Sequence, residues 1–217
     1  MGHLRHGYTN STFGDGMFVV KCFAGPDALT RLDTERVMLR RYRGRLPVPS
    51  VVKVSETSLT TRFVTGEHGQ DLLDDGHAVE VLRACGKLLR LIQSMPVRSG
   101  RVLVHGDFGP NNLLLDPETF EPAALVDWEW AHAGDPVEDL VWCEWIIRTH
   151  HPEHAWALPE FFAAYGGPIP DWPARQAAMV ARCQELLDFC TRWEPGGPGE
   201  KTWLERIEAV TGWSDPR

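Results

Sequence analysis

The stretch HGDFGPNNLLLD, residues 105–116, gathers polar side chains between two apolar runs. It holds two carboxylates, a histidine and two adjacent asparagines around a Gly and a Gly-Pro, directly after the apolar residues 102–104. Gly, Pro, Asn and Asp are ordinary turn formers, so a solvated turn is the simplest interpretation. Residues elsewhere in the sequence distinguish that interpretation from a functional one.

Composition restricts the class of protein. The chain has 217 residues, enough for one domain or two small lobes, and 43% hydrophobic with 24% charged residues is typical of a globular fold. Its five cysteines are scattered with no C-x-x-C pair, which predicts neither a zinc site nor a disulfide framework and favours a reducing cytoplasm. A net charge of -8 disfavours nucleic acid as the main partner. No signal peptide and no apolar run of the ~18 residues needed to cross a bilayer is visible, so we expect a cytoplasmic protein without a membrane partner.

The order of the predicted elements changes near residue 65. Before it, residues 11–23 read as a hairpin around Asp15-Gly16, followed by a helix over residues 27–43 and two further strands. Beyond it the sequence predicts short strands at 102–104, 113–115 and 123–126, helices at 77–94, 136–149, 158–165, 173–193 and 202–210, and a linker at 194–200. We therefore predict an α+β fold. A small antiparallel-sheet lobe with one helix, residues 1–65, precedes a larger, mainly helical lobe, residues 66–217, with a ligand site at the junction.

Three polar residues have the order that phosphoryl transfer requires. That chemistry needs a carboxylate beside the attacking hydroxyl, a carboxamide five residues later and a further carboxylate at a nearby strand end. Asp107, Asn112 and Asp127 occur in that order. Because Mg²⁺ prefers oxygen ligands, Asn112 and Asp127 are the predicted metal ligands, and Asp107 is the predicted catalytic base.

These motifs resemble a known family. HGDFGPNN, residues 105–112, followed by LVDWEWA, residues 125–131, is similar to the aminoglycoside phosphotransferase and choline kinase type of small-molecule kinase, relatives of the protein kinases. In that family the first motif reads H-G-D-x-x-x-x-N, and the second carries the metal-binding Asp. AGDPVEDL, residues 133–140, is similar to a Gly-Asp-Pro segment that commonly follows. The resemblance implies a bilobal protein-kinase-like fold, with ATP or GTP as phosphate donor and Mg²⁺ as cofactor.

Two residues of the N-terminal part agree with this resemblance. A family member needs a strand lysine on the phosphates and a helix glutamate that holds the lysine. Lys21 lies in the predicted strand, and Glu35 lies on the apolar stripe of the following helix. A carboxylate on a buried helical face is costly unless it is paired, so we expect Glu35 to pair with Lys21.

The remaining nucleotide contacts are less marked in the sequence. The phosphate-covering turn is predicted at residues 7–12, where backbone amides and the hydroxyls of Thr9, Ser11 and Thr12 would serve. The hinge that binds adenine through its backbone is predicted at residues 62–65, which includes Phe63 and Val64.

Support and substrate residues are also predicted. By analogy with protein kinases, His105 braces the catalytic loop by hydrogen bonding. Glu129, Trp130 and Glu144 are candidate substrate contacts, because an aromatic wall beside carboxylates suits a bound cation. For Glu129 a surface position is an equal alternative. For the tryptophans Trp128, Trp130, Trp142 and Trp145, core packing is favoured over a role around a ligand, because large aromatic side chains dominate core burial.

The predicted activity is transfer of the γ-phosphate of ATP or GTP to a hydroxyl of a small molecule. An aminoglycoside or another antibiotic is the first choice of acceptor, with a role in resistance or self-protection. Choline, another amino alcohol or a sugar is the alternative. A nucleotide-binding pseudokinase is a second alternative. A metal-dependent hydrolase using His105, Asp107 and Asp127 is disfavoured, because Lys21 and Glu35 would then have no task. The oligomeric state stays open.

Overall fold

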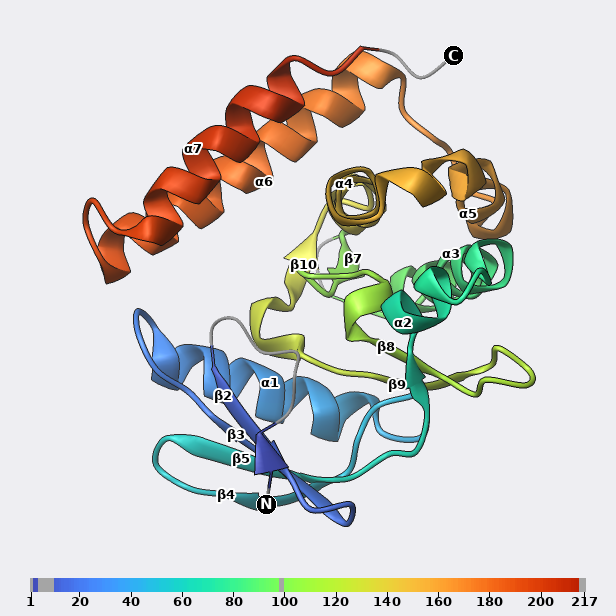
Figure 1. Cartoon of the computed structure of the whole chain (residues 1–217). Helices are drawn as coiled ribbons and strands as arrows, with labels where there is room; N and C mark the ends of the chain where they lie inside the picture. The colour runs from blue at the N-terminus through green and yellow to red at the C-terminus, as the bar shows by residue number, and fades with distance from the viewer. Residues whose placement is uncertain (1, 4–9, 98–99, 215–217) are drawn as a thin grey trace.

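The first sheet has five strands, all paired antiparallel, in the order β1-β2-β3-β5-β4 (Figure 1). The computed structural model describes residues 2–3, 10–97 and 100–214. The strands are β1 Gly2–His3, β2 Ser11–Gly14, β3 Phe18–Cys22, β4 Val51–Val54 and β5 Ser58–Arg62. The predicted β2–β3 hairpin is confirmed. Asp15 accepts hydrogen bonds from the amides of Met17 and Phe18, and Gly16 adopts the positive φ of 81° that the tight turn requires.

Helix α1, Ala28–Tyr42, lies against this sheet and matches the predicted helix within one residue at each end. Its buried face includes Leu32, Glu35 and Leu39, so the predicted apolar stripe is confirmed, and Glu35 does belong to it. A charged side chain on that buried face needs a partner, and Lys21 of β3 provides it by pairing with Glu35 of α1.

The rest of the chain is mainly helical, as predicted (Figure 1). The helices are α2 Gly69–Asp74, α3 Ala78–Gln93, α4 Val137–His150, α5 Leu158–Tyr165, α6 Trp172–Trp193 and α7 Pro198–Thr211. Short strands β6 Glu67–His68, β8 Leu113–Leu115 and β9 Pro122–Leu125 form one small sheet, and β7 Val102–Val104 pairs with β10 His132–Gly134. Three 3-10 turns are Pro110–Asn112, Trp128–Trp130 and Pro152–Ala157.

The predicted linker at residues 194–200 is wrong in its second half, because α7 begins at Pro198. Proline is favoured in the first helical turn, where its missing N–H would have no intrahelical partner. The second of the two strands predicted between residues 43 and 65 ends at Arg62. In the part of the chain that the structure describes, no helix is long and apolar enough to cross a membrane.

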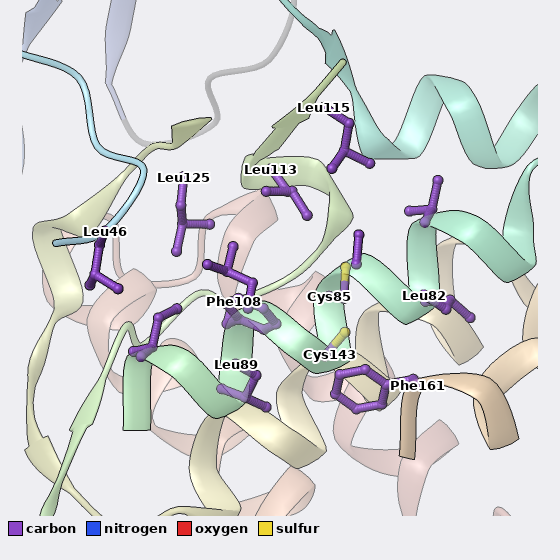
Figure 2. Close-up of a cluster of buried hydrophobic side chains, with 14 of the residues drawn as sticks. Leu46, Leu82, Cys85, Leu89, Phe108, Leu113, Leu115, Leu125, Cys143 and Phe161 are labelled. Atoms are coloured by element: carbon purple, nitrogen blue, oxygen red, sulfur yellow. The ribbon is translucent and has the colours of Figure 1, made fainter. Parts of the chain in front are cut away.

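The main core lies beneath the loop of residues 105–112. Figure 2 shows Phe108 from that loop among Leu89, Leu113 and Leu125. The Phe108 side chain is fully buried, and burying a phenylalanine stabilises a fold by about 1.5–3 kcal/mol. Phe108 therefore anchors the loop from below, next to the residue predicted to be the catalytic base. All five cysteines are free.

Candidate functional site

A cavity of ≈ 380 Å³ lies between the first sheet and the loops that carry the two motifs. The structure brings to this cavity seven of the residues predicted for nucleotide and metal binding: Thr12, Lys21, Glu35, Phe63, Val64, Asn112 and Asp127. Ser11 is exposed, and both Ser11 and Thr12 belong to strand β2, not to a turn. Thr9 lies outside the described residues.

Lys21 is the centre of the charge network in this cavity. Its Nζ lies 2.7 Å from Glu35 Oε2, 2.5 Å from Asp127 Oδ1 and 3.6 Å from Glu129 Oε2. Burial alone would lower the pKa of Lys21, but the charges of Asp127, Glu35 and Glu129 outweigh it and raise that pKa. Burial raises the pKa of Glu35 to about 7, against the opposing effect of Lys21. The ammonium group is therefore charged and faces the cavity with its carboxylate partners.

Glu129 does not contact the cavity as a substrate residue would, which corrects the sequence prediction. Its side chain is fully buried, Asn10 Nδ2 donates to both carboxylate oxygens at 3.0 and 2.9 Å, and Arg31 Nη1 donates at 2.8 Å. Arg31 is 2% exposed and also donates to the carbonyls of Ala24 and Pro26. These bonds connect α1 to the DWE motif, residues 127–129, next to Lys21.

Sequence reasoning missed Arg31, although a signal was present. It lies four residues before Glu35, and residues i and i+4 share one face of a helix. A second ionic residue on the apolar stripe of α1 calls for a second buried partner, and Glu129 supplies it.

Asp107 is held by two side chains. Trp142 Nε1 donates to Asp107 Oδ1 at 2.8 Å, and Asn112 Nδ2 donates to Oδ2 at 2.8 Å and to the Asp107 carbonyl at 2.8 Å. Burial raises the pKa of Asp107, and the charge of Asp127 raises it further. Because the Asn112 nitrogen makes these bonds, the Asn112 oxygen is the atom that remains for a cation.

Asp127 sits in a strained backbone conformation, with φ 66° and ψ 55°. A non-glycine residue in such a region costs on the order of 1–3 kcal/mol and is often found where function requires it. Its carboxylate and the Asn112 carboxamide both line the cavity. These residues fit a magnesium ion, since they offer the oxygen ligands that Mg²⁺ prefers.

His105 lies where a loop brace is expected. It is fully buried, its Nδ1 accepts the Asp107 amide at 3.2 Å, and its Nε2 lies 3.0 Å from the Val126 carbonyl. Burial lowers the pKa of His105, and these contacts together fit a neutral ring with the proton on Nε2. Asp139 of α4 accepts from the amides of His105 and Gly106 at 2.6 and 2.9 Å, so the loop is braced from α4 as well.

The two remaining substrate candidates differ in outcome. Trp130 is half-buried against Phe189 of α6, with ring centroids 5.1 Å apart. Glu144 is fully buried and its two oxygens are bound by Arg148 and Arg175, which corrects its prediction as a substrate contact. A carboxylate whose oxygens are both paired inside the fold has a structural role.

The predicted hinge lies at the edge of the cavity. The Phe63 amide donates to the Met17 carbonyl at 3.0 Å, so this N–H is already paired within the protein. Val64 lines the cavity beside it.

Known proteins resemble parts of this chain in sequence. The model of the phosphotransferase enzyme family matches residues 90–178. Acyl-CoA dehydrogenase family member 10 of Mus musculus is 44% identical over 57 residues, 24% of this chain, and hygromycin-B 4-O-kinase of Escherichia coli is 31% identical over 101 residues, 41% of this chain. These matches span only 5% and 28% of the lengths of the two relatives.

Solved structures match over nearly the whole chain. The GDP and kanamycin complex of APH(2")-IIia has a TM-score of 0.74 at 16% identity and covers 97% of this chain and 92% of that one. Aminoglycoside phosphotransferase APH(4)-Ia has a TM-score of 0.68 at 17% identity and covers 98% and 94%. The chain therefore has the kinase-like fold of the aminoglycoside phosphotransferases, and its residues 90–178 are similar in sequence to the phosphotransferase enzyme family.

Proposed function

We propose that this protein transfers the γ-phosphate of ATP, or GTP, to a hydroxyl of a small molecule. The observation that carries the proposal is the convergence of Lys21, Glu35, Asn112 and Asp127 on one cavity, with the Asp107 carboxylate bound to Asn112. Residues 1–65 would form the nucleotide-binding lobe, and residues 66–217 the catalytic and substrate-binding lobe.

Each polar group has a task in this reaction. Lys21 would bind the phosphates, with Glu35 holding its ammonium group in place. Asn112 and Asp127 would hold Mg²⁺, which when bound neutralises charge on the phosphates. The Phe63 carbonyl and Val64 would contact the nucleotide base. Glu129 and Arg31 keep α1 and the DWE motif together while the nucleotide binds.

Asp107 would orient the acceptor hydroxyl and take its proton. The hydroxyl oxygen then forms a bond to the γ-phosphorus as the bond between that phosphorus and the β–γ bridging oxygen breaks, and ADP leaves. Positioning and electrostatic stabilisation supply most of the rate in such transfers. The hydrogen bonds from Trp142 and Asn112 keep the carboxylate in one orientation before the acceptor arrives.

An aminoglycoside or another antibiotic is the proposed acceptor. The Escherichia coli relative is a hygromycin-B kinase, and structural neighbours were solved with kanamycin, gentamicin and hygromycin B. Such an activity would confer resistance or self-protection. Choline, another amino alcohol or a sugar is the alternative acceptor. The five free cysteines fit a reducing cytoplasm, where we place the activity.

An ADP-release screen tests the proposal. The protein with Mg-ATP or Mg-GTP is mixed with a panel of aminoglycosides, other antibiotics, amino alcohols and sugars. We expect acceptor-dependent ADP release and a product heavier by one phosphoryl group. A thermal-shift titration with Mg-ATP runs beside it. Stabilisation by Mg-ATP without ADP release under any condition would favour the nucleotide-binding pseudokinase instead.

A further inference from the structure

Arg182, in the middle of α6, reaches the catalytic loop 76 residues before it in the chain. Its Nη2 donates to the Gly106 carbonyl at 2.7 Å. Its guanidinium carbon lies 5.6 Å from the Trp130 ring centroid and 5.8 Å from that of Trp142. The side chain is 20% exposed, so the cation is largely desolvated between two indoles, where cation–π attraction is strongest.

The bond to Gly106 fixes one particular peptide group. The carbonyl of the peptide between Gly106 and Asp107 accepts from Arg182, and its N–H donates to His105 Nδ1. Gly106 has φ 85°, and a Cβ on it would lie 2.7 Å from the Trp130 carbonyl, so no other residue fits there without strain. Both polar atoms of this peptide are therefore held, and the peptide sets the direction in which Asp107 leaves the loop.

The same cluster holds the Asp107 side chain. Trp142, one of the two rings that contact Arg182, donates its indole N–H to Asp107 Oδ1. Displacing the Arg182 guanidinium would therefore remove one of the two hydrogen bonds that hold the peptide before Asp107, and it would take away a contact of the ring that orients the Asp107 carboxylate. No other residue of α6 contacts this loop through a hydrogen bond in the described ranges.

In this orientation the Arg182 guanidinium does not use all of its hydrogen-bond donors. Its Nε is buried and has no hydrogen-bond partner in the described part of the chain, and a buried donor without a partner lowers stability. Its Nη1 pairs with Glu185, one turn further along α6. The orientation is thus determined by the Gly106 carbonyl, Glu185 and the two rings, not by pairing every donor.

We propose that Arg182 is a positioning residue for Asp107, acting through the Gly106 carbonyl and the Trp142 indole. The inference rests on the proposed function for its kinetic consequence. Misplacing a catalytic group by about 1 Å can cost on the order of 100-fold in rate. Arg182 does not line the nucleotide cavity, so its loss should reduce kcat and leave Mg-ATP affinity intact.

The test compares three variants. Arg182→Met keeps an apolar stem between the indoles but removes the donor to Gly106, and Arg182→Lys keeps a donor. Arg192→Met is the control, because Arg192 also lies in α6 and contacts an aromatic ring, that of Phe189, but its side chain is 56% exposed and pairs with the similarly exposed Asp27. The readouts are kcat for ADP release, the Kd of Mg-ATP, and the indole N–H resonance of Trp142, assigned with Trp142→Phe.

For Arg182→Met we expect kcat to fall about 10- to 100-fold with the Kd of Mg-ATP within about threefold of wild type, partial recovery in Arg182→Lys, and a shifted Trp142 resonance. Arg192→Met should keep the wild-type kcat and resonance. An Arg182→Met variant with wild-type kcat, or with kcat and Kd changed in parallel, would overturn the inference. If wild-type protein released no ADP, the proposed function would fail separately, and an unshifted Trp142 resonance would still refute the role of Arg182.

Discussion

The buried pair between Arg31 and Glu129 offers a sharp test of the network behind Lys21. The substitution Arg31→Met keeps most of the volume of the side chain and removes its charge. It leaves the Glu129 carboxylate, whose side chain is fully buried, with hydrogen bonds from Asn10 and with Lys21 at 3.6 Å. The bonds from Arg31 to the carbonyls of Ala24 and Pro26 are lost as well.

The expected magnitude follows from burial. Removing one partner of a buried ion pair costs about 3–5 kcal/mol, because the other charge stays desolvated. Asn10 and Lys21 still contact Glu129, so we expect the lower end, about 3 kcal/mol of unfolding free energy. For a chain of this length 1 kcal/mol corresponds to about 2–4 °C, and the melting temperature should therefore fall by roughly 6–12 °C.

The assay is urea and thermal unfolding of Arg31→Met, Glu129→Gln and the double variant. The double variant should lose less free energy than the sum of the two single changes, because the second substitution removes the charge that the first left unpaired. Arg83→Met is the control. Arg83 pairs with Glu160 with 52% of its side chain exposed, and should lose less than about 1 kcal/mol. Additive losses, or equal losses in Arg31→Met and Arg83→Met, would refute the reasoning.

Three further predictions concern packing, thiols and nucleotide binding. Gly86→Ala should destabilise the protein by about 1–3 kcal/mol in urea unfolding, because the new Cβ would lie 2.8 Å from the backbone nitrogen of Tyr165 in α5; an unchanged midpoint would contradict this. A thiol reagent should label the half-buried Cys22 and Cys190 in the native protein and all five cysteines after unfolding, as counted by intact mass. Labelling of Cys85, Cys143 or Cys183 in the native protein would contradict their burial in the core. Lys21→Met should weaken Mg-ATP binding at least about tenfold by calorimetry, since the phosphates lose their cation, and wild-type affinity would count against the assigned role.

The positions of the main site residues follow from the sequence because they lie in short motifs with fixed spacing. Asp107 and Asn112 are five residues apart in one loop, so their contact depends on local geometry alone. The cost of an unpaired carboxylate on an apolar stripe predicts that Glu35 pairs with Lys21, and in the structure Lys21 Nζ lies 2.7 Å from Glu35 Oε2.

Glu129 and Glu144, the two corrected residues, could not be placed from the sequence. Glu129 and Glu144 are both buried, but the sequence does not show which distant cation reaches a carboxylate. Arg31 lies 98 residues from Glu129, and Arg175 lies 31 residues from Glu144. Only tertiary packing brings these partners together. The sequence alone therefore suggests a substrate contact for Glu144, and a substrate contact or a surface position for Glu129.

Some helices and strands are too short for their residues to show a recognisable hydrophobic periodicity. Helix α2 has six residues and strand β10 has three, which is less than two helical turns or a clear alternation. The role of Trp142 was hidden for another reason. The ring does pack in the core, as predicted, but its one polar atom points at Asp107. Composition and spacing give no signal for that hydrogen bond.

The most direct test of the account is the substitution Asp107→Asn, compared with wild type in ADP release and in calorimetry with Mg-ATP. The amide keeps the size of the carboxylate but cannot accept the acceptor proton. We predict that Asp107→Asn binds Mg-ATP with nearly wild-type affinity and releases no ADP with an acceptor that supports wild-type turnover. Wild-type turnover in this variant would contradict the assignment of Asp107 as the base of a phosphotransferase.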